Sequence, residues 1–326
     1  MSKLVTIYGG SGFIGRYIAR RMAKEGWRVR VAVRDPNQAM FVRPYGAVGQ
    51  VEPVLCNVRD DDSVALAARG ADAVVNCVGI LAEAGRNTFK AVQAEAPGRI
   101  ARIAAASGVT TMVHVSAQGA DADGPSEYSR TKAAGEAAVL AHMPNAMIVR
   151  PSIVFGAEDE FFNRFASLSR IGPVLPVVGA DTLFQPVHVD DVAAAVVKGV
   201  TGHASGVYAL GGPDVKSFRG LMEVLLDVVR RRRLVLNIPN WAAHIMAFSF
   251  KIAGVLSLGI IKAPITADQI CSLSEDNVVP AGARGFAELG IKPAAMAAIL
   301  PDYLWRYRPS GQFNEIKKSA KNLRNT

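Results

Sequence analysis

The glycine-rich segment at residues 9–15 restricts the possible folds of this chain more than any other feature. It reads Gly9-Gly10-Ser11-Gly12-Phe13-Ile14-Gly15, follows an apolar run that ends at Tyr8, and precedes helical spacing over residues 16–25. Glycine is needed where the backbone turns with positive φ or where a phosphate approaches bare backbone. The next helix N-terminus offers free N–H groups and a positive dipole end to a pyrophosphate. The segment therefore predicts a dinucleotide site.

Apolar strands and helical stretches alternate along the first half of the chain. Such a repeat of strand, helix and strand predicts a parallel sheet with helices on both faces. We therefore expect an α/β fold with a doubly wound parallel (Rossmann) sheet. The expected strands are 3–8, 28–34, 51–55, 73–77, 111–115 and 146–149, and the expected helices are 16–25, 63–69, 91–107 and 129–142.

The pattern changes after Arg150-Pro151. A further strand leads into a helix that ends at Val200, and beyond Gly206 the spacing is mainly helical. We expect a nucleotide-binding domain of residues 1–155 and 181–202, and a smaller, mainly helical C-terminal domain of residues 156–180 and 203–305. Residues 306–326 carry six Lys or Arg against one Glu and predict an extended basic tail.

Charge and cysteine content narrow the classes further. Lys and Arg number 37 and Asp and Glu 28, a net charge of +9, which suits an acidic ligand or an anionic surface. The four arginines at residues 230–233 have no aromatic residues interspersed with them, so we expect no nucleic-acid partner. Cys56, Cys77 and Cys271 are odd in number and widely spaced, which argues against disulfides and against a metal site. The same cysteine pattern favours a reducing compartment. The first strand begins so early that we expect no targeting segment.

The end of the second expected strand indicates which dinucleotide is bound. An NAD site usually places an acidic residue about 20 residues past the glycine loop. Here the strand ends in Arg34. The next two residues, Asp35-Pro36, suit the cap and the first position of a helix. Arg34 is then available to a 2′-phosphate, which its planar guanidinium can bind. The pattern favours NADPH.

Tyr128 and Lys132 form a second constellation. Residues four apart share one helix face. A nearby ammonium lowers the pKa of a phenol, so the tyrosine could exchange a proton with a carbonyl or alcohol at neutral pH. These two residues are candidate catalytic residues.

Together these segments resemble the short-chain dehydrogenase/reductase superfamily in its extended, epimerase-like branch. The resemblance covers residues 3–215 and adds Asn76–Gly79, Arg150–Ser152 and Val187–Val192 to the segments above. It implies that the glycine loop holds the pyrophosphate, that Asn57 and Val58 lie by the adenine, that Gly79 lies behind the cofactor, and that Tyr128 and Lys132 reach the nicotinamide ribose. The implied cofactor-binding set is Gly9, Gly10, Ser11, Gly12, Phe13, Ile14, Gly15, Arg34, Asn57, Val58, Cys77, Val78, Gly79, Tyr128, Lys132, Pro151 and Ser152. His114 and His188 match no catalytic position and are expected to be packed strand histidines.

The chain departs from that pattern at one place. Active members carry a Ser or Thr beside the tyrosine, just past the fifth strand. Here Ser116 ends the strand about two positions too early, and the matching place holds Gln118. The catalytic set is therefore incomplete, and cofactor binding without turnover is expected.

Several segments resemble the NADPH-binding accessory subunit of respiratory complex I, the alpha-subcomplex subunit nine family. They are Tyr128–Glu136, Arg150–Asp159, Phe161–Phe165 and Gln185–Val189. This resemblance implies a non-catalytic, NADPH-binding subunit of NADH:quinone oxidoreductase on the cytoplasmic face of a bacterial inner membrane. Its partners would be subunits of the peripheral and membrane arms, near the quinone site. An active NADP-dependent reductase or epimerase that uses Tyr128, Lys132 and Ser116 is the alternative, and a redox-sensing binding module is a third reading.

The C-terminal third contains a run of 21 mostly apolar residues, Trp241–Ile261. His244 and Lys251 interrupt it on one helix face, and a central Lys costs roughly 2.5–3.5 kcal/mol on insertion. We therefore expect an amphipathic helix that lies on protein or in a membrane interface rather than a transmembrane span. Residues Arg230–Arg233 precede it and would attract an anionic lipid surface.

Overall fold

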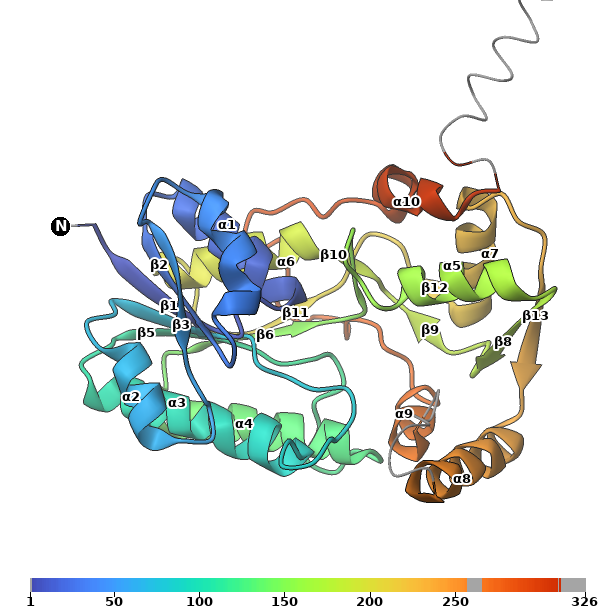
Figure 1. The fold of residues 1–326 in the computed structure, drawn as a ribbon, viewed down its shortest axis with the longest axis horizontal. Coiled ribbons are helices and arrows are strands. Elements are labelled where there is room, and N and C mark those ends of the chain that lie inside the picture. The colour runs from blue at the N-terminus through green and yellow to red at the C-terminus, as the bar shows by residue number, and fades with distance from the viewer. Residues whose placement is uncertain (1, 257–265, 310, 312–326) are drawn as a thin grey trace, which may run out of the picture. The chain divides into compact units, whose positions relative to one another are not determined.

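The computed structural model describes residues 2–256, 266–309 and 311, and within helix α8 it leaves the side chains of 247 and 250–256 undescribed. The chain divides into two compact units (Figure 1). The first unit comprises residues 1–152, 189–211 and 278–293, and the second comprises 153–188, 212–277 and 294–326.

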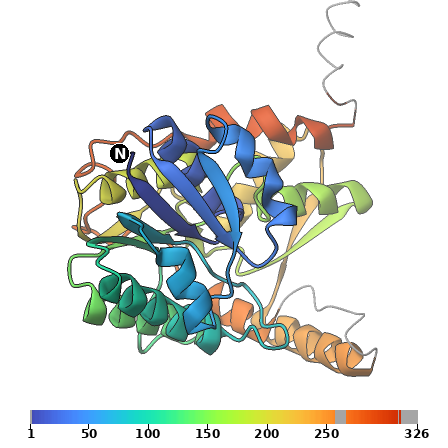
Figure 2. The same ribbon diagram turned by 60° about the vertical axis from the view of Figure 1, so that its left-hand side comes forward.

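The first unit is built on a seven-stranded, wholly parallel sheet in the order β11-β6-β5-β4-β1-β2-β3. This confirms the doubly wound α/β fold. Helices α1 and α6 cover one face, and α2, α3 and α4 cover the other (Figures 1 and 2). The strands are β1 (Leu4–Tyr8), β2 (Arg28–Val33), β3 (Val51–Leu55), β4 (Ala73–Asn76), β5 (Thr111–Val115), β6 (Met147–Pro151) and β11 (Gly206–Leu210). The helices are α1 (Phe13–Lys24), η1 (Asn37–Tyr45), α2 (Asp61–Ala68), η2 (Lys90–Glu95), α3 (Ala96–Ala106), α4 (Glu127–His142) and α6 (Val189–Val200).

The helices lie close to the sheet and to one another because small residues stand at the contacts. A Cβ on Gly135 of α4 would overlap the carbonyl oxygen of Gln93, and one on Gly98 of α3 would press on Ala138. Arg21 of α1 forms a bidentate pair with Asp190 of α6, at 2.7 and 2.8 Å. The glycine contacts fix α4, which carries Tyr128 and Lys132, against η2 and α3.

The second unit has its own core of aromatic and aliphatic side chains from α5, α7 and α10, with Phe155, Phe162, Phe184 and Phe218 in ring contact. Short strands pair as β7 with β10, β9 with β12, and β8 with β13. The elements are β7 (Val154–Phe155), α5 (Phe162–Ile171), β8 (Val174–Val178), β9 (Leu183–Phe184), β10 (Val187–His188), β12 (Lys216–Ser217), α7 (Phe218–Val228), β13 (Leu234–Ile238), α8 (Asn240–Leu256), α9 (Ala267–Ser272), α10 (Met296–Leu304) and η3 (Trp305–Tyr307).

The structure differs from the sequence-based expectation beyond residue 200. The region after Gly206 is not mainly helical from its start, because β11 completes the large sheet beside β6 and β13 pairs with β8. Residues 181–188 belong to the second unit, since β9 and β10 pair there, and residues 203–211 and 278–293 belong to the first.

Among the described residues, no helix is long and apolar enough to cross a bilayer. Helix α8 covers most of the apolar run, whose last residues, 257–261, lie outside the described part. Most of the expected basic tail also lies outside it.

Candidate functional site

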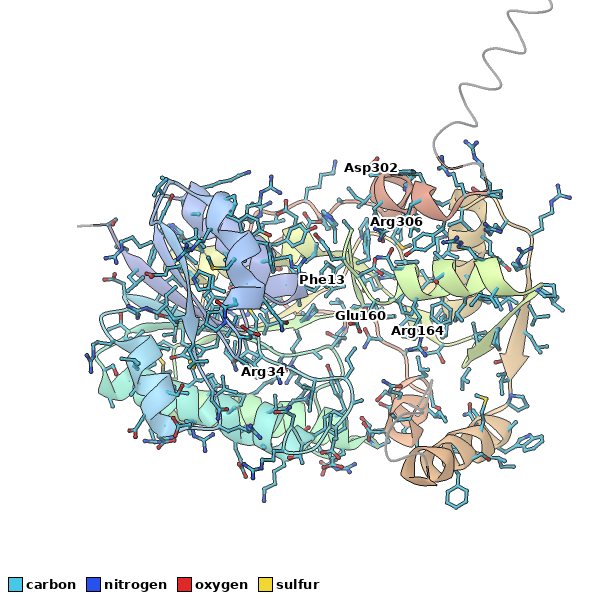
Figure 3. All side chains as sticks on the ribbon, in the orientation of Figure 1. Phe13, Arg34, Glu160, Arg164, Asp302 and Arg306 are labelled. Atoms are coloured by element: carbon cyan, nitrogen blue, oxygen red, sulfur yellow. The ribbon has the colours of Figure 1, made fainter. Side chains whose placement is uncertain are left out.

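The glycine loop joins β1 to α1 in a turn that only glycine can make. Gly9 adopts φ +76°, and its amide donates to the carbonyl of Ala32 at 2.9 Å. A Cβ on Gly15 would overlap the carbonyl oxygen of Gly9. Gly12 caps α1 without any side-chain hydrogen bond, and the first helical turn carries no acidic residue. Figure 3 labels Phe13 at the start of this helix. The turn therefore leaves the positive end of α1 open to an anion.

A cavity of about 240 Å³ lies against this loop, at the carboxyl ends of the parallel strands. Ligands of open α/β sheets bind at this edge. Of the expected cofactor-binding residues, the structure brings Gly9, Ser11, Gly12, Arg34, Asn57, Val58, Cys77, Val78 and Gly79 together in the lining. Gly10, Phe13, Ile14 and Gly15 lie in the same loop and first helical turn, whereas Pro151 and Ser152 lie at the end of β6, away from the lining.

At the end of β2, Asp35 and Arg34 have different structural surroundings. The Asp35 carboxylate accepts from the amides of Asn37 and Gln38, at 3.0 and 3.4 Å, so it caps the following turn. Arg34 is exposed and lines the cavity (Figure 3). No lining residue is acidic.

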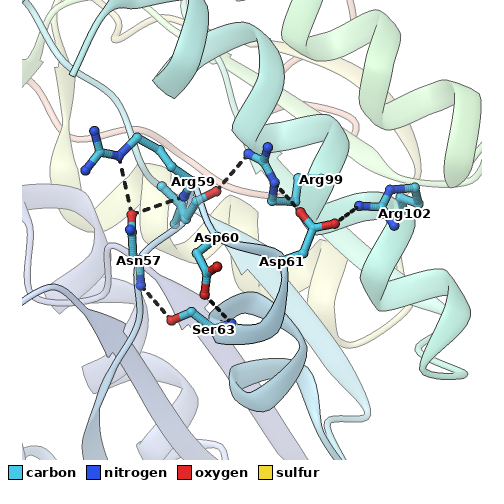
Figure 4. A network of polar contacts seen from close by, with 8 residues as sticks. Asn57, Arg59, Asp60, Asp61, Ser63, Arg99 and Arg102 are labelled. Atoms are coloured by element: carbon cyan, nitrogen blue, oxygen red, sulfur yellow. Dashed lines mark hydrogen bonds and ion pairs between the residues drawn. The ribbon is translucent and has the colours of Figure 1, made fainter. Parts of the chain in front are cut away.

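Sequence reasoning missed Arg59, which supplies a second cation to the lining. Figure 4 shows how Asn57 positions it: the Asn57 Oδ1 atom accepts from the Arg59 backbone N–H at 3.2 Å and from its Nε at 3.4 Å. The Arg59 guanidinium also donates to the carbonyl of Arg86 at 2.9 Å, which ties it to the loop after β4. Asp61 bridges Arg99 and Arg102, both at 2.6 Å, and so fixes α2 on α3 below this corner. Other lining residues missed from sequence are Ala32, Val33, Cys56, Ile80, Asn87 and Val92.

The π-helical turn η2 explains why Val92 could not be found from helical spacing. A π-turn shifts the residue register and is frequent at functional sites. Here Val92 lines the cavity, while the next residue, Gln93, donates to the carbonyl of Ile80 at 2.6 Å and accepts from Thr131 at 3.2 Å.

Asn76, at the end of β4, links the cavity to the next strand. Its Oδ1 accepts from the Val78 amide at 3.1 Å, so its amide nitrogen faces His114 Nδ1, also at 3.1 Å. An amide NH₂ can only donate, so His114 Nδ1 accepts and Nε2 carries the proton. Burial lowers the pKa of His114 to about 3, with a smaller contribution from the Lys132 charge. The expectation of a packed strand histidine is confirmed for His114; His188 lies in β10 with its ring 5.6 Å from that of Phe155.

Lys132 and Tyr128 stand on α4, which Ser126 caps by accepting from the Ser129 amide at 3.0 Å. Lys132 Nζ lies 3.5 Å from the carbonyl of Val115 and 5.9 Å from the centre of the Tyr128 ring. A Cβ on Gly79, which lines the cavity, would lie 3.4 Å from the same Nζ, but neither Lys132 nor Tyr128 is itself among the lining residues. Burial lowers the pKa of Lys132 to about 8, against the opposing effect of Glu136.

The expected activation of the tyrosine is wrong. Burial raises the pKa of Tyr128 to about 12, and its ring packs edge-on against Phe89 at 6.0 Å. Burial is the cause of this rise, and the phenol holds its proton at neutral pH.

Gln118, which stands where the family resemblance leads one to expect a hydroxyl, forms two hydrogen bonds to the backbone. The Gln118 amide donates to the carbonyl of Pro151 at 2.8 Å, and its side-chain Nε2 donates to the carbonyl of Val278 at 3.1 Å. Ser116 is buried at the end of β5, and its hydroxyl has no hydrogen-bond partner among the described residues. Among those same residues, no group of three His, Cys, Asp or Glu side chains is arranged to hold a metal.

The motif around Asp159 serves the fold of the second unit. The Asp159 carboxylate accepts from the amides of Asn163 and Gly156, at 3.0 and 3.1 Å, and from the Tyr303 hydroxyl at 2.6 Å. Arg306, labelled in Figure 3, donates to Asn163 Oδ1 at 2.6 Å. The motif thus joins the start of α5 to α10 and η3.

Comparison with known proteins agrees with this geometry. Residues 2–240 match the family model of the RmlD substrate binding domain. The chain is 32% identical over 316 residues to the NADH dehydrogenase [ubiquinone] 1 alpha subcomplex subunit 9, mitochondrial, of Arabidopsis thaliana, covering 94% of this chain and 79% of the relative. It is 31% identical to the ceramide reductase of Caulobacter vibrioides, over 83% of this chain and 79% of that protein. In fold it resembles the NADPH-dependent quinone oxidoreductase QOR2 of Escherichia coli in complex with NADPH (TM-score 0.69, 16% identity, 92% of this chain and 98% of that one).

Proposed function

Since this chain belongs to the family of the alpha subcomplex subunit 9 of NADH dehydrogenase, on a short-chain dehydrogenase/reductase fold, we propose that it is a non-catalytic, NADPH-holding accessory subunit of a bacterial NADH:quinone oxidoreductase. The observation that carries the proposal is the hydrogen bonding of Gln118 to the backbone. Where a reductase needs a hydroxyl to hold the reacting carbonyl, this chain has an amide bonded to the backbone at Val278.

The backbone and the charge of the cavity lining support a phosphorylated dinucleotide as its ligand. The tight glycine turn has no room for side chains and leaves the first turn of α1 for the pyrophosphate. Arg34 would bind the 2′-phosphate, because Asp35 is engaged in capping and no acidic side chain lines the cavity. Asn57 and Val58 would lie by the adenine, and Lys132 would donate to the nicotinamide ribose. NADPH would bring a hydride that can be donated to a substrate, but in this proposal the chain's own residues only hold the cofactor.

The pKa of Tyr128, the candidate proton donor, supports retention of NADPH rather than its use in a reaction. A general acid works best when its pKa lies near the working pH. The pKa of Tyr128, about 12, is far above that range. Bound NADPH would instead stabilise the folded state by mass action, because it binds only the native protein.

In the assembly, this subunit would stabilise the junction of the peripheral and membrane arms near the quinone site, on the cytoplasmic face of the inner membrane. Relatives of this family carry the names of complex I subunits, which supports such partners.

Affinity purification tests this directly. The tagged chain, solubilised with its membranes in mild detergent, should co-purify with the flavin and iron–sulfur subunits and carry NADPH. A Gly12→Leu variant should lose the nucleotide, because the new side chain enters the cavity, and should assemble less well. Recovery as a free protein, or normal assembly of the nucleotide-free variant, would overturn the proposal.

A second function, an NADPH-dependent carbonyl reductase, is favoured by one observation. The unpartnered, buried Ser116 hydroxyl stands at the end of β5, next to the Val115 carbonyl that Lys132 contacts, and the chain has a reductase relative at 31% identity. In that case Tyr128→Phe should abolish turnover of a carbonyl substrate. Under the main proposal the same variant leaves both NADPH content and assembly unchanged.

A further inference from the structure

An apolar ladder lies on the outer face of the two-stranded sheet in the second unit. Strands β8 and β13 pair in parallel, with Leu234 opposite Val174 and Leu236 opposite Pro176. Because side chains alternate along a strand, these four residues share one face, and Leu175 and Val177 turn into the core on the other. Leu234 is 65% exposed and Leu236 50%, so the ladder is uncovered.

The exposed apolar surface continues at both ends of the ladder. Ile171, at the end of α5 just before β8, is 81% exposed. After β13 the chain enters α8, where Trp241, Ile245 and Phe248 are 69%, 59% and 64% exposed. These three residues form an apolar ridge, since their spacing of four and three places them on one helix face. Ala243, on the opposite face, packs against Val178 and Ile270.

An arginine cluster borders the ladder. Arg231, Arg232 and Arg233 lead directly into β13, and Arg170 lies in the last turn of α5, just before Ile171. Arg233 Nε donates to the carbonyl of Ser169 at 2.8 Å, which holds the two segments side by side. None of these four arginines has a carboxylate partner among the described residues. Burial and the charges of Arg233 and Arg170 lower the pKa of Arg231, which shows how close the like charges lie.

We propose that the apolar ladder, the apolar ridge and the arginine cluster form a surface that docks on an anionic lipid monolayer. Large exposed apolar patches mark interaction sites, and a lipid interface is the partner that accepts both features here. Apolar side chains, with a tryptophan among them, enter the boundary of the acyl chains, while arginines bind headgroup phosphates. A protein partner would need carboxylates placed opposite each arginine, whereas anionic lipids rearrange to meet them.

This inference deepens the proposed function, because it assigns the membrane contact of that subunit, and it is tested without the complex. The purified full chain is mixed with vesicles of phosphatidylcholine, or of phosphatidylcholine with phosphatidylglycerol, and separated by flotation. We expect binding to the anionic vesicles that weakens as salt is added.

Two double variants separate the contributions. L234S/L236S should weaken binding about tenfold through lost apolar contact. R170E/R232E should weaken binding to anionic vesicles by at least about tenfold, since each basic residue near the surface contributes about fivefold. The matched controls, L55S/L66S and R20E/R28E, change exposed residues of the same types in the first unit and should bind as the unaltered chain does.

Absence of flotation with anionic vesicles, or flotation of either variant at the level of its control, overturns the inference. If the chain does not float and L234S/L236S loses co-purifying subunits, the surface docks on protein instead. If the chain floats but no oxidoreductase subunits co-purify with it, the lipid surface stands and the proposed function fails.

Discussion

The nucleotide cavity and the β5–α4 corner beside it differ in what their residues can do. The cavity, at the carboxyl ends of β1 to β4, combines the glycine turn, the open helix terminus, Arg34 and Arg59 with a lining that contains no acidic residue. At the β5–α4 corner, burial raises the pKa of Tyr128 to about 12, and Gln118 is hydrogen-bonded to the backbone. Under the proposed function, the difference teaches that nucleotide binding and proton transfer are separable demands on this fold.

The largest effect is expected from a substitution in the glycine turn, which would disrupt the nucleotide cavity. Gly15→Val places a side chain on the carbonyl of Gly9, so the turn must open. We expect loss of measurable NADPH binding and a destabilisation of about 2–4 kcal/mol, measured by calorimetry and chemical unfolding. Gly172→Ala is the matched control, because nothing lies within 4 Å of a Cβ at that position. NADPH binding by the Gly15 variant at normal affinity would show that the loop is not the site.

A smaller effect is expected from a substitution of Arg34, which tests whether the cavity prefers NADPH to NADH. Arg34→Ala should weaken NADPH binding by roughly 10- to 100-fold, the scale of a lost hydrogen bond to a charged group, and leave NADH binding unchanged. Isothermal titration with both nucleotides measures this. Arg20→Ala, an exposed arginine on α1, serves as control. An equal loss for both nucleotides would remove Arg34 from the 2′-phosphate site.

The smallest effect concerns Lys132 and pH. Its pKa in the folded chain is about 8, below its ordinary value of 10.5. Between those values the unfolded chain holds a proton that the folded chain lacks, so the free energy of unfolding should rise with pH in this window. NADPH needs the protonated amine, so its affinity should fall above pH 8, by up to about tenfold per pH unit.

Lys132→Met should remove both pH dependences, in unfolding titrations and in nucleotide binding. The conservative Lys132→Arg should keep nucleotide binding but flatten its response to pH. A pH response of the unaltered chain that persists in Lys132→Met would assign it to another group.

Local patterns predicted the first unit well, because its strands and the glycine turn are encoded within a few residues of one another. β11 was missed since it is held by its pairing with distant β6. Arg59 and Val92 were missed because their placement depends on contacts that local spacing does not reveal. Arg59 is held by hydrogen bonds to Asn57 and Arg86, and Val92 is placed by a π-turn.

The pKa of Tyr128 was misjudged because the i to i+4 spacing reveals the neighbouring ammonium but not the burial of the phenol. Part of that environment is the ring of Phe89, which precedes η2 and is remote in the chain. The structural use of Gln118 likewise depends on Val278, 160 residues away.

The central claim, that this chain holds NADPH without oxidising it, is tested most directly by following the fluorescence of the bound nicotinamide in the purified complex while NADH and quinone turn over. We predict that the bound NADPH stays reduced and unexchanged through many turnovers. Oxidation of the bound NADPH at a rate that depends on Tyr128 would contradict the account and show that the β5–α4 corner is a working active site.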